Sequence, residues 1–264
     1  MGTAYDSRKA REVFPKLMAY HRWFCNARDP QGKGVIGIIN PWESGRDNCP
    51  DWDIGMKGIT VPDNLMSYAR RDISYVDSDQ RPSQAQYDRF ITIVQFGREV
   101  KWDHRAINAR GPFLMADPGV QFILLRACRD LQELAHLLDM DEPIDEIRGW
   151  IDRLTTGCDW LWNDDIGGYC ARDIRSGDFS NAITNASMLS FFAGVGSSDQ
   201  RASMVAHCRR ILDACRYGMP SWDPEDRNFE PKRYWRGPVW AVMNHMIVAG
   251  LVDAGESELA SRIS

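Results

Sequence analysis

The 264-residue sequence lacks most of the patterns that identify a nucleotide, metal or membrane protein. It has no Gly-x-Gly-x-x-Gly, no phosphate-loop sequence and few strand signals, which disfavours nucleotide-binding folds. The seven cysteines form no Cys-x-x-Cys pair and the five histidines lie far apart, so we expect no metal and no other cofactor. At a net charge of −5 no basic stripe argues for nucleic acid, and no apolar run is long enough to span a membrane.

The cysteines and the first residues also bear on the compartment. An odd number of scattered cysteines is typical of reduced thiols. The sequence from Met1 to Lys9 leads into no apolar signal core, so we do not expect export. We therefore expect a cytoplasmic protein, whose oligomeric state the sequence does not indicate.

The apolar residues recur with a helical period. The clearest stripe is Ile144, Ile147, Ile151, Leu154, Cys158 and Leu161. Asp117-Pro118 has the residue types of a helix start. We expect further helices over 7–26, 63–77, 84–108, 182–193 and 204–215, one opened by Pro238 and one beginning near Glu256, with a short hairpin at 167–170. Such helices joined by long polar loops predict a single all-α domain of paired helices in an α/α toroid, with the site in loops at one end.

The run from Pro41 to Asp53 is the first that suggests chemistry. It places four carboxylates within eleven residues, between Trp42 and Trp52, and Gly45 with two prolines prevents a packed helix. A carboxylic acid can protonate a leaving glycosidic oxygen while indole faces stack on a sugar ring. The same residue types also make ordinary surface turns, so this run alone leaves both interpretations open.

The second run, from Pro231 to Trp240, places three large aromatic residues within seven positions. The three are Tyr234, Trp235 and Trp240, and two arginines, a glycine and a proline among them break any helical or strand period. Aromatic walls with arginines beside them suit a small polar ligand.

Taken together, Glu-Ser-Gly-Arg-Asp-Asn at 43–48 and Tyr-Trp-Arg-Gly-Pro-Val-Trp at 234–240 resemble glycoside hydrolase family 63. More narrowly they resemble its mannosylglycerate and glucosylglycerate hydrolases. The resemblance implies an (α/α)6 barrel, or toroid, that cleaves α-glycosidic bonds with inversion. It implies a small carbohydrate substrate, which in the narrower group is anionic because it contains glycerate.

The resemblance assigns roles by position. Asp47 matches the general acid, and the implied substrate contacts are Gly45, Tyr234, Trp235 and Trp240. We expect Trp42 to help bury Asp47 and Glu43 to bond to the substrate or to the loop. Arg46 stands where relatives often have an apolar residue, and it would lower the pKa of Asp47 if it pointed inward.

Arg81 and Tyr87 resemble the pair that holds the glycerate carboxylate. A physical argument points the same way, because Pro82 stands where a helix would begin and a helix N-terminus attracts anions. The alternative is a solvated Arg81 and a core Tyr87.

The resemblance also implies a glutamate base in a loop a few dozen residues beyond the second run, whereas the sequence ends at Ser264. We therefore expect residues 1–264 to form a single partial domain, lacking N-terminal and C-terminal portions of the barrel and holding about eight of twelve helices. Glu225 or Glu230 could substitute as the base. Two alternatives stay open: a hydrolase of a neutral α-glucoside, of the α-glucosidase or trehalase type, and a catalytically inactive fragment that at most binds sugar.

Overall fold

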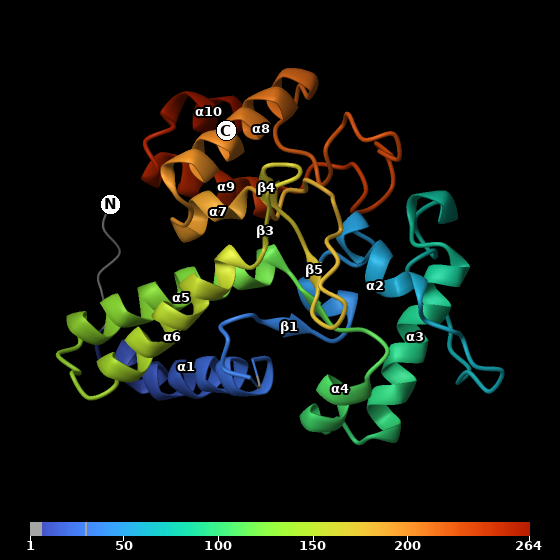
Figure 1. Ribbon diagram of the computed structural model, residues 1–264, viewed down its shortest axis with the longest axis horizontal. Coiled ribbons are helices and arrows are strands. Elements are labelled where there is room, and N and C mark those ends of the chain that lie inside the picture. Colours follow the sequence, from blue (N-terminus) through green and yellow to red (C-terminus); the bar gives the residue numbers. More distant parts are fainter. Residues whose placement is uncertain (1–6, 30) are drawn as a thin grey trace.

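The computed structural model describes residues 7–29 and 31–264. Three groups of helices surround central loops and short strands (Figure 1). The first group packs α1, α5 and α6, which span Ser7–Ala27, Pro118–Leu137 and Ile144–Asp159. The second contains α7, α8, α9 and α10, which span Leu189–Ala193, Ser198–Ala214, Ala241–Asp253 and Ser257–Ile263. The third contains α3 and α4, which span Gln84–Glu99 and His104–Arg110.

The first group forms as the sequence predicts. Asp117 caps α5 by accepting the backbone N–H of Gly119 at 2.8 Å, and Pro118 occupies the first turn, where its missing N–H costs nothing. Along α6, the buried residues include Ile147, Leu154 and Cys158 of the expected stripe. Burial of such a stripe against neighbouring helices supplies most of the stability of a helix in a globular protein.

Short strands connect the groups. Strand β1 (Gly37–Ile38) pairs antiparallel with β2 (Met115–Ala116), which also pairs antiparallel with β5 (Arg172–Asp173). Strands β3 (Trp162–Asn163) and β4 (Gly168–Tyr169) form the expected hairpin, with Trp162 opposite Tyr169. The larger of two hydrophobic clusters among the described residues runs through these elements; it includes Phe14, Phe122, Trp150, Ile183 and Leu251. Across the described residues, no helix is both long and apolar enough to cross a bilayer.

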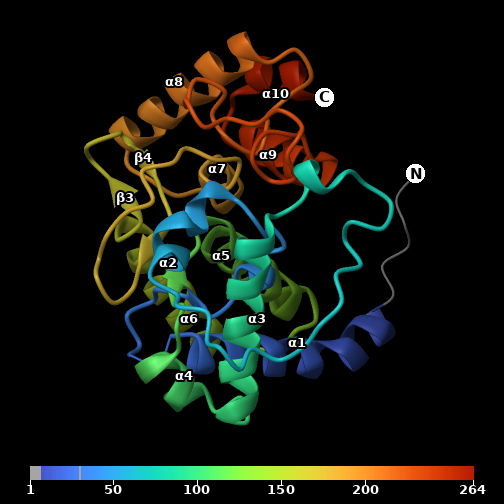
Figure 2. The same cartoon turned by 90° about the vertical axis from the view of Figure 1, so that its right-hand side faces the viewer.

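The helix predicted over 63–77 is wrong. Residues 59–80, which we call the strap, follow the short helices η1 (Pro41–Ser44), η2 (Pro50–Trp52) and α2 (Asp53–Lys57) and contain only the 3-10 turn η3 (Ser78–Gln80). Figure 2 shows the strap as a long cyan trace passing α3. Two of its polar groups bond to α3: the N–H of Met66 donates to Gln95 Oε1 at 2.7 Å, and the Tyr68 hydroxyl bonds to Asp88.

Other helix boundaries also differ from expectation. The helix expected over 84–108 is divided between α3 and α4, because Lys101 and Trp102 adopt positive φ angles of 53° and 59°. Only 189–193 of the segment 182–193 is helical, since Thr184 pairs with Trp222 in a β-bridge. The late helix begins at Ala241, three residues after Pro238. The start expected near Glu256 is confirmed by α10.

Candidate active site

The two runs singled out in the sequence lie side by side. The backbone N–H of Trp235 donates to Asn48 Oδ1 at 3.0 Å. Arg236 donates through both Nη atoms to the carboxylate of Asp53, at 3.1 and 2.9 Å. These contacts span more than 180 residues of sequence and fix the loop that carries Asp47 against the aromatic run.

A tight turn shapes the Asp47 loop. Asn40 caps η1 by accepting the N–H of Trp42 at 2.9 Å. Gly45 ends the turn in the left-handed region at φ 71°, which a residue with a side chain reaches only with strain. Gly45 is exposed at this turn, immediately before Arg46 and Asp47.

Arg46 points into the protein interior. Its guanidinium pairs with Asp51 at 2.7 Å and with Asp117 at 2.6 Å, and it lies 5.1 Å from the centroid of the Trp52 ring. Trp52 returns a bond from Nε1 to the carbonyl oxygen of Arg46 at 2.7 Å. The charge of Arg46 is therefore taken up by two buried carboxylates, and it is Arg81 rather than Arg46 that opposes protonation of Asp47.

The environment of Asp47 favours its protonated form. Burial raises the pKa of the Asp47 carboxyl, while Arg81 and a hydrogen bond from Tyr234 oppose that rise; Asp72 adds to it. The net pKa lies above the ordinary value for an aspartate. A carboxyl held protonated by burial is the form that a general acid requires.

The aromatic run forms a compact platform beside Asp47. Trp235 and Trp240 stack in parallel with ring centroids 4.3 Å apart, and the Tyr234 ring meets Trp240 edge-on at 5.4 Å. Tyr234 has a positive φ of 29°, a strained conformation for a bulky residue and one that is typical of functional sites. Within the described part of the chain, Asn48 Nδ2 and Trp235 Nε1 are buried donors with no hydrogen-bond partner.

The structure brings Arg81 and Tyr87 to the same place. Arg81 lies over the Tyr234 ring, 3.7 Å from its centroid, and its Nε is 3.5 Å from Asp72. Tyr87 meets Trp42 edge-on at 5.7 Å. Burial raises the pKa of Tyr87, and the charges of Asp72 and Asp47 contribute to that rise. Arg81 is thus neither solvated nor distant from Asp47.

The helix-start argument for an anion site needs correction. Helix α3 begins at Gln84 and is capped by Ser83, not by Pro82. Ser83 Oγ accepts the N–H of Gln86 at 3.2 Å, and Gln86 Oε1 accepts the N–H of Ser83 at 3.0 Å. This capping box occupies two backbone donors at the start of the helix, so the positive charge nearest this point is the guanidinium of Arg81 rather than free N–H groups of α3.

Glu43 bonds to the loop and its surroundings. One carboxylate oxygen pairs with Arg28, and the other accepts the N–H of Ile39 at 2.9 Å. Both oxygens therefore support the start of the Asp47 loop.

Three residues of the site were missed in the sequence. Arg70 donates to Asp72 at 3.1 and 2.6 Å and lies over the Tyr87 ring. The Tyr68 ring stacks with the Tyr87 ring, with their centroids 5.5 Å apart. All three lie on the strap. The helix predicted over 63–77 does not bring these side chains to the Asp47 loop, although the run of charged residues at 70–72 could have indicated a polar site.

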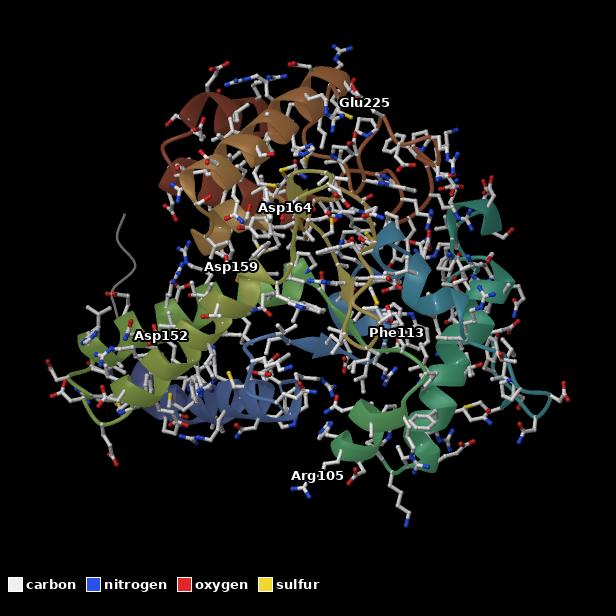
Figure 3. All side chains as sticks on the ribbon, in the orientation of Figure 1. Arg105, Phe113, Asp152, Asp159, Asp164 and Glu225 are labelled. Carbon is white, nitrogen blue, oxygen red and sulfur yellow. The ribbon has the colours of Figure 1, made fainter. Side chains whose placement is uncertain are left out.

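Glu225 and Glu230 already have arginine partners. Figure 3 shows Glu225 at the top of the molecule beside α8, where it pairs with Arg210 at 2.7 Å. Glu230 pairs with Arg233 at 2.9 Å and with Arg236 at 3.3 Å. Such pairing argues against a free base at either position. Among the described residues, no group of three or more His, Cys, Asp or Glu side chains is placed to hold a metal ion.

Comparison with known proteins identifies a family and several relatives that this chain resembles. The sequence profile of the mannosylglycerate hydrolase MGH1-like glycoside hydrolase domain matches residues 2–264. The mannosylglycerate hydrolase MGH1 of Selaginella moellendorffii is 41% identical over 254 residues, covering 96% of this chain and 52% of that protein. The glucosylglycerate hydrolase of Mycolicibacterium hassiacum is 29% identical over 257 residues, covering 92% of this chain and 56% of that protein.

A crystal structure extends the likeness to the fold. The GH63 mannosylglycerate hydrolase from Thermus thermophilus, in complex with Tris and D-glycerate, matches with a TM-score of 0.94 at 39% identity. The match covers 99% of this chain and 63% of that one. It confirms the all-α (α/α)6 toroid, of which this chain holds a part. The chain spans only 52% of the Selaginella relative's length.

Proposed function

The chain belongs to the family of mannosylglycerate hydrolase MGH1-like glycoside hydrolase domains, and on this premise we propose that it carries the acid side of a glycosidase site for a sugar α-linked to glycerate. The substrate is mannosylglycerate or glucosylglycerate. Asp47 protonates the glycosidic oxygen, and cleavage inverts the configuration at the sugar carbon. The observation that carries this proposal is the raised pKa of Asp47 between Tyr234 and Arg81.

The charges around Asp47 suit proton transfer. Burial raises the pKa of the Asp47 carboxyl and so favours its protonated form in the resting site. The hydrogen bond from Tyr234 and the charge of Arg81 stabilise the carboxylate that forms once the proton has left. The stacked indoles of Trp235 and Trp240 offer an apolar platform for the sugar ring.

The same surroundings suit one carboxylate on the substrate. Arg70, Arg81 and Asp72 sum to one positive charge when Asp47 is protonated, and a glycerate carboxylate would neutralise it. Arg81 can hold that carboxylate through two parallel bonds. The D-glycerate complex of the Thermus relative supports this choice of leaving group.

A second candidate function is sugar binding without turnover. An inverting glycosidase needs a second carboxyl roughly 6.5–9.5 Å from the first. The arginine partners of Glu225 and Glu230, and the 52% of the Selaginella relative that the chain spans, favour this candidate for the chain alone. We propose accordingly that residues 1–264 form a single partial domain.

All seven cysteines are free thiols, which supports the proposal that the protein is located in a reducing cytoplasm.

The test measures sugar release and binding together. The 264-residue chain is incubated with mannosylglycerate, glucosylglycerate and trehalose, and binding of each is followed by calorimetry. Asp47→Asn should lower any turnover by at least about a hundredfold, the usual contribution of a general acid, while leaving binding intact. Arg81→Ala should weaken both glycerate substrates and leave trehalose unchanged.

Each result separates two candidates. Turnover that survives Asp47→Asn would show that another group supplies the proton. Binding without release would favour the sugar-binding candidate, and preferential cleavage of trehalose would favour a hydrolase of neutral α-glucosides.

A further inference from the structure

The strap supplies a residue that sets which anion the site accepts. We propose that Asp72 limits the anion site to a single negative charge, so that it binds a monocarboxylate and discriminates against a dianion. The inference rests on the proposed function of the Asp47 site, because it specifies the charge of the ligand group that Arg81 meets.

The first step is that Asp72 occupies Arg70. Arg70 Nε donates to Asp72 Oδ1 at 3.1 Å, and Arg70 Nη2 donates to Oδ2 at 2.6 Å. Nη2 also donates to the carbonyl oxygen of Pro82 at 2.8 Å. The side chains of Arg70 and Asp72 are only 10% and 11% exposed. The donor fork of Arg70 is therefore used within the protein and cannot receive a ligand carboxylate without displacing Asp72.

The second step is that Arg81 is held in place without Asp72. Its guanidinium stacks on Tyr234 at 3.7 Å from the ring centroid, whereas its contact with Asp72 is a single 3.5 Å approach through Nε. Within the part of the chain that the structure describes, the two Nη atoms of Arg81 have no hydrogen-bond partner. Arg81 thus presents one available cation, and stacking rather than ion pairing sets its orientation.

The third step follows from charge. The interaction of Asp72 with a ligand is proportional to the ligand's charge, so Asp72 repels a dianion twice as strongly as a monoanion. Compensation by Arg81 covers one charge only. Removing the Asp72 charge would free the Arg70 fork and leave two cations facing the ligand. The preference for a monoanion should then decrease or reverse.

The experiment compares D-glycerate with tartronate, its dicarboxylate analogue, by isothermal titration calorimetry on the full 264-residue chain. The wild-type protein should bind D-glycerate more tightly than tartronate. Asp72→Asn should tighten D-glycerate binding by about tenfold and tartronate binding by about a hundredfold, since the second effect is the square of the first. Asp72→Glu keeps the charge and should keep the wild-type order. Asp63→Asn removes an exposed carboxylate elsewhere on the strap and should change neither ligand by more than about twofold.

The outcomes distinguish this inference from the proposed function. If both proteins bind D-glycerate but Asp72→Asn does not tighten tartronate binding more than D-glycerate binding, the charge limit is wrong and the glycerate site stands. If neither wild type nor Asp72→Asn binds D-glycerate, the glycerate site and the inference both fail. Tighter binding of tartronate by the wild type overturns the inference without any variant, so the test does not depend on how Asp72→Asn folds.

Discussion

The buried ion triad beneath the Asp47 loop offers a quantitative test of how that loop is held. Arg46 is 2% exposed, and its two partners, Asp51 and Asp117, are 1% and 0% exposed. The perturbation is Arg46→Met. Methionine keeps much of the side-chain volume and flexibility, so the change removes the charge and its hydrogen bonds and adds only a small cavity.

The expected cost is large because two carboxylates lose their partner. Removing one member of a buried ion pair costs about 3–5 kcal/mol, since the remaining charge stays buried without compensation. Here both Asp51 and Asp117 are left, and Asp117 is also the cap of α5. We expect a loss of at least about 4 kcal/mol, a large share of the roughly 5–15 kcal/mol that stabilises a typical domain.

The loss should depend on pH in a defined direction. Burial already raises the pKa of Asp117 while the charge of Arg46 opposes that rise, so without Arg46 the folded-state pKa of Asp117 should lie still further above the unfolded value of about 3.9. The folded variant then binds more protons than the unfolded chain between these two values, so its stability falls as pH rises. The destabilisation should be largest at neutral pH and should shrink as pH falls toward about 4.

The assay is urea unfolding followed by tryptophan fluorescence, at neutral pH and near pH 4.5. Arg22→Met is the matched control, because Arg22 also bonds through two nitrogens to one carboxylate, Glu146, but is 48% exposed. That exposed pair should be worth at most about 1 kcal/mol. An Arg46→Met protein no less stable than Arg22→Met, or a loss independent of pH, would refute the reasoning.

Three further predictions use other parts of the structure. Carboxyl NMR should find the pKa of Asp47 above the ordinary aspartate value, and Arg81→Ala should raise that pKa further. Because the folded-state pKa of Asp47 is raised, Asp47→Asn should increase the free energy of unfolding more at pH 7 than at pH 3. A smaller increase at pH 7 than at pH 3 would contradict the burial argument. In α6, Gly157→Ala would place Cβ 1.9 Å from the Gly34 oxygen and should lower the free energy of unfolding by more than about 2 kcal/mol. Gly149→Ala, whose Cβ would meet nothing closer than 3.8 Å, should raise it by about 0.5–1 kcal/mol. Thermal unfolding measures both. An apolar cavity of about 260 Å³ between α1 and α5 should favour association, so light scattering that shows a stable monomer at high concentration would contradict the partial-domain proposal.

Sequence patterns located the elements whose signals are local. The first residues of α5 carry their own cap, and the stripe of α6 repeats over several turns, so neither depends on distant contacts. The break after α3 has no such signal. Lys101 and Trp102 adopt positive φ without a glycine or proline, because the Trp102 ring packs against Gly97. Tertiary packing decides that boundary, and a periodicity argument cannot detect it.

The site could be predicted in part for the same reason. The two aromatic and acidic runs are unusual in composition and were visible in the sequence, and the structure places them together. The contribution of the strap was not visible, because Arg70 and Asp72 matter only through the path that brings them to Arg81. The direction of Arg46 was equally undetermined, since its partner Asp117 lies 71 residues away.

The arrangement of arginines explains why Asp47 is the carboxyl available for protonation. Four carboxylates occupy the run 43–53, and three of them each form an ion pair with an arginine. The pairs are Glu43 with Arg28, Asp51 with Arg46, and Asp53 with Arg236. Each pair anchors the loop to a different part of the fold. Asp47 alone forms no ion pair within 4 Å among the described residues, so burial determines the direction of its pKa shift. A loop fixed by three ion pairs can therefore hold the fourth carboxyl in a buried place that favours its protonated form, which is the state required by the proton donation that we propose for Asp47.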